Sequence, residues 1–382
     1  RPWLERAGID PAAVREVAPA WRPPVYADRA VSFEAPAGEA GVVRVEAASF
    51  GGRPVWFEVV EPGARPRHVP AGDGAETTVF FWLIGLFYVV VAVLAVVLAR
   101  RNLRLGRGDR RGALRVAAFV FVVDFLGWAI AAPHSASLVE LLSLLEGAAF
   151  STLAAMLVYL AYLALEPIVR RRWPQRLVSW TRLLSGDLAD PMVGRDVLWG
   201  VLAGAAMGAV ALGRNAAASA SLGSPVPLHA ASPPTFEGWR GLLLQLSGTV
   251  VSALVVALTS TVFVVLLYAV LRRRWLAALA FWLLFSLVLV VGNVPAPATV
   301  VLSAAAAGIW TLALVRGGLL TMAVTHAVFF FGLYFPWTLD PGAWYLRATV
   351  VAAGLTVALA VYGAVVAAGG RHALAGWLPE EG

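Results

Sequence analysis

Nine long apolar runs occupy the chain from residue 78 onward, and they limit its fold more than any other feature. An apolar helix of about 20 residues matches the hydrocarbon thickness of a bilayer, where only helices and closed barrels satisfy the backbone. The sequence therefore predicts an all-α polytopic membrane bundle of about nine transmembrane helices. The runs cover residues 78–99, 113–132, 138–165, 196–212, 241–271, 275–292, 297–315, 317–335 and 345–368.

The composition agrees with a membrane protein and excludes several kinds of site. The chain is 60% hydrophobic and only 14% charged, whereas soluble domains carry roughly 25% charged residues. Every basic residue is arginine, so the lysine of a P-loop or of a kinase ATP site is absent. The chain also has no cysteine, which excludes disulfides, thiolate metal sites and cysteine nucleophiles. We therefore expect no catalytic, cofactor-binding or metal-binding residue in this segment.

The arginines fall almost entirely on alternate loops. Most lie in the loops at 100–112 and 166–195, and the turn Arg272–Arg274 continues the pattern. The opposite loops contain only Arg214, Arg240 and Arg347. Basic residues next to membrane spans concentrate on the cytoplasmic side. We therefore expect the arginine-rich loops and the C-terminus in the cytoplasm, and we attribute the net charge of +7 to topology rather than to a nucleic-acid partner.

Residues 1–77 are more polar, and we predict that they form a small α+β domain outside the membrane, ahead of a transmembrane domain at 78–382. Apolar residues alternate along two of the segments, which is typical of strands with one buried face. The predicted elements are a short helix over 10–17, strands over 31–35, 42–48 and 54–60, and a hairpin turn at Gly51-Gly52.

The cytoplasmic segment 166–196 predicts a short amphipathic helix. From Pro174 onward, Leu177, Trp180 and Leu184 share one helical face. A basic helix with an aromatic residue on its apolar side lies in the headgroup plane and contacts anionic lipid. The alternative is an arginine-rich loop that only sets the topology. The candidate lipid-contact residues are Arg170, Arg171, Arg172, Trp173, Arg176, Trp180 and Arg182.

The next apolar run, 196–212, carries two further signals. Asp190, Arg195 and Asp196 lie at its entry and predict structural ion pairs. Small residues on one helical face allow close approach of a partner helix, within the chain or in a second copy of a homo-oligomer. The alternative is that the spacing only reflects the 36 glycines of the chain. The candidate packing residues are Gly200, Gly204 and Gly208.

Ionisable residues inside apolar runs are candidates for function. Asp124 and Glu146 are each about two turns from the outer end of neighbouring antiparallel runs, so they can lie at similar depth and share a proton or a cation. The alternative is a neutral carboxyl group with a local hydrogen-bond partner. His326 is a candidate ligand or general base, but it has no companions at metal-ligand spacing. The alternative is a packed structural histidine.

Several long stretches resemble a known family. The string LALEPIVRRRWPQRLVSWTRLLSGDLADPMVGRDVLWG and the string FPWTLDPGAWYLRATV are similar to the membrane region of a family of bacterial transmembrane serine/threonine-protein kinases. Trp21–Asp28, followed by VRVEAASFGGRPVWFEVVEP, is similar to the external segment of the same family. The resemblance covers nearly the whole chain, and it implies a multi-pass protein of the bacterial inner membrane.

The resemblance also implies a function. In that family a cytoplasmic kinase domain precedes a membrane crossing, an external segment and a multi-helix region. This chain has no Gly-rich loop, HRD or DFG motif, so ATP and Mg²⁺ would belong to a kinase domain outside it. We expect a membrane-embedded sensory or anchoring module with the lipid bilayer as its partner. The alternatives are a transporter or channel that uses Asp124 and Glu146, and an intramembrane hydrolase that uses His326.

Overall fold

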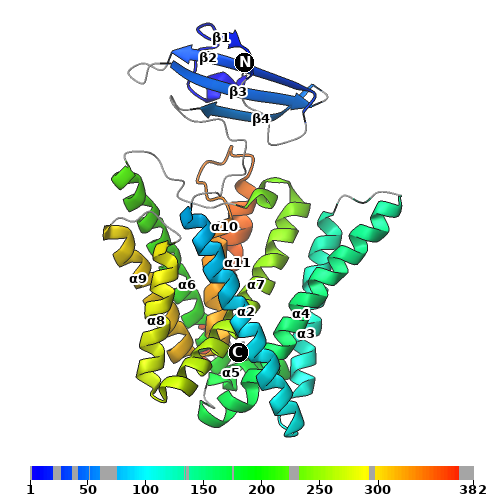
Figure 1. The fold of residues 1–382 in the computed structure, drawn as a ribbon, viewed down its shortest axis with the longest axis vertical. Helices are drawn as coiled ribbons and strands as arrows, with labels where there is room; N and C mark the ends of the chain where they lie inside the picture. The colour runs from blue at the N-terminus through cyan, green and yellow to red at the C-terminus, as the bar shows by residue number, and fades with distance from the viewer. Residues whose placement is uncertain are drawn as a thin grey trace, which may run out of the picture. The chain divides into compact units, whose positions relative to one another are not determined.

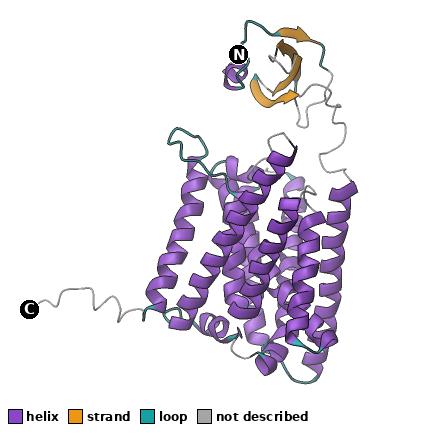
Figure 2. Cartoon of the chain, turned by 90° about the vertical axis from the view of Figure 1, so that its left-hand side faces the viewer, coloured by secondary structure: helices purple, strands orange, loops and turns teal. Residues whose placement is uncertain are grey.

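The fold comes from a computed structural model that divides into two units, Arg1–Thr78 and Val79–Gly382, each described by itself below. Figures 1 and 2 show a strand-rich first unit and a helical second unit. The structure describes residues 2–19, 27–36, 42–50, 52–60, 75–132, 134, 137–173, 176–222, 232–291 and 297–369.

The first unit is a four-stranded antiparallel sheet in the order β1-β2-β3-β4. The predicted strands are present, and β3 and β4 pair as a hairpin with Val45 opposite Val59. Gly52 has φ +76°, as a tight turn requires, whereas Gly51 lies outside the described residues. The elements are α1 (Pro2–Arg6), β1 (Arg15–Val17), β2 (Arg29–Pro36), β3 (Val42–Phe50) and β4 (Arg53–Val60).

The helix predicted over 10–17 is absent. Asp10 caps a turn, since its carboxylate accepts a hydrogen bond from the Ala12 N–H at 2.9 Å. The following residues form β1, where Glu16 pairs with Phe33 of β2. Sheet pairing has overridden the local helix signal, because the ladder supplies the backbone partners that a short helix would otherwise provide.

The second unit is a bundle of long apolar helices (Figure 2). Within the described residues, seven helices are long and apolar enough to cross a membrane, and α8 and α10 are shorter. The predicted count of nine spans is therefore not confirmed. The helices are α2 (Ala75–Arg104), α3 (Arg110–Ala131), α4 (Leu138–Arg172), α5 (Val178–Ser185), α6 (Pro191–Leu222), α7 (Trp239–Leu271), α8 (Arg274–Val291), α9 (Pro297–Leu312), α10 (Leu319–Tyr334) and α11 (Leu346–Ala367), with a 3₁₀ turn η3 (Pro233–Phe236) and a π-helical turn η4 (Ala313–Gly317).

Helix α10 is shorter than a membrane span, and its position inside the bundle accounts for this. Its 16 residues rise about 24 Å, less than the roughly 30 Å of a hydrocarbon core. Nine of those residues are buried, because α10 packs against α6 and α7. Other helices surround α10 over much of its surface, so its length does not have to match the bilayer.

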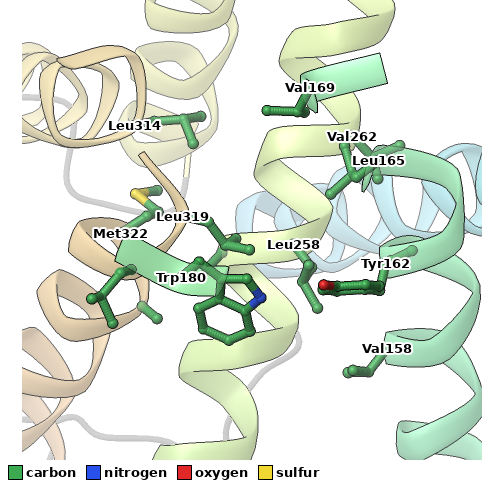
Figure 3. Close-up of a cluster of buried hydrophobic side chains, with 14 of the residues drawn as sticks. Val158, Tyr162, Leu165, Val169, Trp180, Leu258, Val262, Leu314, Leu319 and Met322 are labelled. Carbon is green, nitrogen blue, oxygen red and sulfur yellow. The ribbon is translucent and has the colours of Figure 1, made fainter. Parts of the chain in front are cut away.

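The main apolar core lies where α4, α5, α7 and α10 meet (Figure 3). Tyr162 of α4, Trp180 of α5, Leu258 of α7 and Met322 of α10 are all at most 3% exposed. A smaller cluster joins α7, α10 and α11 around Phe335. The packing of these helices positions the segments that carry the arginines.

Candidate functional site

We call one end of the bundle the arginine-rich end. Basic residues from several segments line two cavities there. They belong to α2 and the loop after it, the end of α4, the turn before α5, the start of α6, the C-cap of α7, and η4. The side chains that define this end are Arg101, Arg107, Arg171, Arg176, Arg195, Arg272 and Arg316.

Helix α5 inserts into the bundle at this end. The predicted amphipathic helix is present over Val178–Ser185, and it ends at Gly186, whose φ of +94° suits a left-handed C-terminal cap. Trp180 is only 3% exposed, and in Figure 3 it lies between Leu319 and Tyr162 with its indole nitrogen toward the Tyr162 hydroxyl. The structure thus corrects the assignment of Trp180 as a lipid contact, because its apolar face meets other helices.

Of the other predicted lipid-contact residues, some form ion pairs or a ring contact and others line cavities. Arg170 pairs with Glu166 at 2.7 Å, and Arg182 pairs with Asp190. The ring of Trp173 packs against Tyr268, with centroids 5.4 Å apart. The Arg172 side chain and Pro174 lie outside the described residues. Arg171 and Arg176 instead line the two cavities.

The predicted charge cluster at the entry of α6 forms two separate ion pairs. Asp190 bonds to Arg182 and also caps α6, accepting from the Met192 N–H at 2.8 Å. Asp196 lies 3.1 Å from the Arg195 guanidinium and is buried. The Asp196 carbonyl also accepts a hydrogen bond from the Thr321 hydroxyl at 3.1 Å. These bonds fix the start of α6 against α10.

The first cavity, called here the α6–α9 cavity, has a volume of about 870 Å³. Three arginines and one carboxylate stand at its polar side, and most of the remaining wall consists of apolar side chains of α6 and α9. It is defined by Arg176, Arg195, Arg316, Trp199, Leu202 and Ile309. No local sequence pattern indicates this site, since Arg195 and Arg316 lie on segments far apart in the chain.

The arginines of the α6–α9 cavity influence one another. Burial is the main reason that the pKa of the Arg176 guanidinium is lowered. The Asp196 carboxylate opposes that change in pKa, whereas Arg316 and Arg195 add to it. Like charges have therefore been brought together on a partly buried surface, where their repulsion is screened less than in water.

The second cavity, called here the α2–α7 cavity, has a volume of about 590 Å³. The end of α2 is fixed beside it, because the Asn102 amide donates to the Leu163 carbonyl of α4 at 2.9 Å. Its lining is more polar than that of the α6–α9 cavity. The basic residues at this cavity are Arg101, Arg107, Arg171 and Arg272.

The structure places Asp124 and Glu146 in different surroundings. The Asp124 carboxylate accepts a hydrogen bond from the Ser151 hydroxyl of α4 at 2.8 Å, and Ser151 is 1% exposed. Glu146 instead lies on the exposed first half of α4. The structure therefore pairs Asp124 with a serine that the sequence analysis did not consider, and one helical turn or more separates that serine from Glu146.

His326 is completely buried on α10. Its Nδ1 lies 3.1 Å from the Met322 carbonyl one turn earlier. The ring packs edge to face against Trp310, with centroids 4.1 Å apart, and against Phe330. Nε2 has no hydrogen-bond partner in the described part of the chain, and neither does the buried hydroxyl of Ser303. No nucleophile is therefore bonded to this imidazole, and no group of three His, Asp or Glu side chains in those residues can hold a metal ion.

Two of the three predicted packing glycines contact α10. A Cβ on Gly200 would lie 2.6 Å from the Val324 side chain, and one on Gly204 would lie 2.6 Å from the Thr325 carbonyl. Gly208 has open space around its Cβ position. The partner of this glycine face is therefore within the chain. A second close approach, which the glycine spacing did not predict, brings Gly194 against the backbone of Ala367 on α11.

No protein-family model matches this chain, and no curated protein or solved structure is significantly similar to it.

Proposed function

We propose that this chain is a non-catalytic, membrane-embedded sensory or anchoring module. Following the resemblance of its sequence, we further propose that it serves a bacterial serine/threonine-protein kinase. The observation that carries the proposal is the closed apolar packing around Trp180, Leu258 and Met322. Densely packed interiors act as rigid scaffolds, which suits a module that holds and orients an attached domain.

The chemistry of the residues is consistent with this proposal. The chain has no lysine for an ATP phosphate and no HRD or DFG motif, so phosphoryl transfer would be performed by a kinase domain attached to it. The arginine-rich end would face that domain in the cytoplasm, by the positive-inside bias. The sheet of residues 1–78 would then lie on the outer side of the inner membrane.

The two alternative functions receive less support. A transporter that uses Asp124 and Glu146 requires the two carboxylates to share a site, but Asp124 bonds to Ser151 and Glu146 is exposed. A hydrolase that uses His326 requires a nucleophile within hydrogen-bond reach of the imidazole, and among the described residues the His326 ring bonds only to its own helix.

The test is to isolate the native gene product from its own membranes through an epitope tag at the C-terminus. We expect a polypeptide well above the 40.4 kDa of this chain that transfers labelled phosphate from ATP to serine or threonine. The chain 1–382 expressed alone should show no transfer, and membranes from a strain lacking the gene give the background. A native product without a kinase domain would refute the proposal.

A further inference from the structure

We propose that the α6–α9 cavity binds one anionic phospholipid, with the lipid phosphate at Arg176, Arg195 and Arg316 and an acyl chain along Trp199, Leu202 and Ile309. This inference does not depend on the attached kinase domain. It names a lipid site formed by tertiary structure, which differs from the surface helix that the sequence predicts.

Positive charge dominates the polar side of the cavity. Arg176, Arg195 and Arg316 line it together with one carboxylate, Asp196. Asp196 is already paired with Arg195 at 3.1 Å. Among the described residues, no carboxylate oxygen lies within 4.0 Å of the Arg176 or Arg316 guanidinium. The cavity therefore carries an excess of positive charge, and an anion would complement it.

The cations of the cavity are all guanidinium groups, which suit phosphate. A guanidinium presents its donors in a planar fork that binds phosphate oxygens in pairs, and such charge-assisted hydrogen bonds are stronger than neutral ones. Arg176 is half-buried and close to Arg316 and Arg195. A bound phosphate would offset the repulsion among these three groups while satisfying their donors.

The apolar wall of the cavity favours a lipid over a soluble anion. Trp199 is 60% exposed, Leu202 is 54% exposed and Leu312 is 58% exposed. All three belong to spans that are apolar enough to cross a membrane. An acyl chain along these side chains would be continuous with a headgroup at the arginines, whereas free phosphate would contact only the arginines. Basic pockets between membrane helices are recognised binding places for anionic headgroups.

The local backbone holds the arginines in place. Gly318 has φ +93°, and a Cβ at this position would lie 2.6 Å from the Arg176 carbonyl. The segment that enters α5 is thus pressed directly against the end of η4, which carries Arg316. A site whose charged groups are fixed before binding loses less conformational entropy when the ligand arrives.

The experiment measures binding of phosphatidylglycerol to the full chain, purified in detergent and stripped of lipid. Phosphatidylcholine with the same acyl chains is the comparison lipid, and glycerol phosphate and inorganic phosphate are the soluble competitors. The test variant is Arg176→Gln/Arg316→Gln. The matched control is Arg171→Gln/Arg272→Gln, which removes the same charge from the α2–α7 cavity.

We expect the test variant to weaken phosphatidylglycerol binding by about tenfold or more, since it loses charge-assisted hydrogen bonds. The control should change the affinity by less than about twofold, and the soluble phosphates should compete poorly. Equal weakening by both variants would show that only the general charge of this end matters. Equal binding of phosphatidylcholine, or full competition by inorganic phosphate, would also overturn the proposal.

A second measurement covers the case in which the double variant fails to fold. Phosphatidylglycerol with a photoreactive group in its acyl chain is added to the unmodified chain, and the labelled peptides are identified by mass spectrometry. We expect labels on the peptides that contain Trp199, Leu202 and Ile309. Leu202→Trp, which fills the apolar wall, should remove them. Labels confined to α2 and α3 would contradict the proposed site.

Discussion

Helices α2 and α10 are both strongly apolar, but they occupy opposite environments. In α2 the buried apolar residues Val91, Ala95 and Ala99 follow one another every four positions, while Val89 and Val93 are about 60% exposed. In α10 nine residues are buried, including Thr321, Thr325 and His326. Helix α2 therefore packs against the protein along a narrow stripe and exposes the rest of its surface, whereas other helices enclose α10.

The comparison shows that hydropathy alone does not separate the two environments. Lipid tails are as apolar as a protein core, so a valine faces either one at similar cost. Polar side chains do distinguish them, because a buried hydroxyl or imidazole needs a partner that lipid does not supply. In α10 the Thr321 hydroxyl donates to the Asp196 carbonyl of α6 at 3.1 Å. Gly200 and Gly204 of α6 lie against α10 in the same enclosed region.

The largest expected effect is a loss of folding stability, and a pair of tryptophan variants tests it. Trp180→Ala, beside α10, should lower the free energy of unfolding by about 3–5 kcal/mol, because it leaves a cavity in packed protein. Trp82→Ala, on α2, should change it by less than about 0.5 kcal/mol, since Trp82 is 75% exposed. Thermal unfolding in detergent measures both. Similar losses of unfolding free energy for the two variants would contradict the description of α2 as exposed and α10 as enclosed.

A second pair of variants tests the same distinction through glycines. Gly204→Ala should destabilise the protein by about 1–3 kcal/mol, because the new Cβ would lie 2.6 Å from the Thr325 carbonyl of α10. Gly85→Ala on α2 should be neutral or stabilising by up to about 1 kcal/mol, since nothing lies within 4 Å of its Cβ position. Unfolding in a denaturing detergent series measures both values. An unchanged Gly204→Ala protein would mean that α6 and α10 are less closely packed than described.

A third test concerns α3 and α4, which lie between the two extremes. Ser151→Ala should cost about 1–2 kcal/mol, because the Asp124 carboxylate loses its hydrogen bond. Glu146→Gln should have no measurable effect on stability, since Glu146 is exposed. A double-mutant cycle with Asp124→Asn isolates the coupling of Asp124 with Ser151. Coupling of Asp124 with Glu146 instead would restore the predicted carboxylate pair.

The smallest expected effect is a pH dependence outside the spans. The pKa of His134 is raised above 6.5, first by the Ala129 carbonyl at 2.5 Å and then by the Glu140 carboxylate at 2.5 Å. The resulting stability is fully present below about pH 6.5 and is lost as the pH rises through the folded-state pKa. An NMR titration should give a lower pKa for His134 in Glu140→Gln. An unchanged pKa would exclude the ion pair.

The sequence predicted the architecture better than it predicted the sites. Long apolar runs identified the helices of the bundle, and alternation identified β3 and β4, because both patterns are local. The count of spans was not confirmed, since α8 and α10 are short and local hydropathy does not say which helices need to match the bilayer. Leu177, Trp180 and Leu184 defined the correct face of α5, but the sequence could not say whether lipid or protein covers it.

The contacts that define the candidate sites depend on tertiary structure. Ser151 meets Asp124 only because α3 and α4 pack as a pair. Arg195 and Arg316 share a cavity only because α6 packs beside α9. A single sequence contains no signal for such long-range neighbours, so the α6–α9 cavity had to be found in three dimensions.

The enclosed position of α10 has a consequence for biosynthesis. With Thr321, Thr325 and His326 among its 16 residues, this helix is a poor candidate for entering the membrane alone, because insertion strength falls with short length and polar content. Its main partners α6 and α7 precede it in the chain, so they are synthesised before it leaves the ribosome. We therefore expect α10 to enter the bilayer against a preformed protein surface. Deletion of α6 should prevent α10 from inserting into the bilayer.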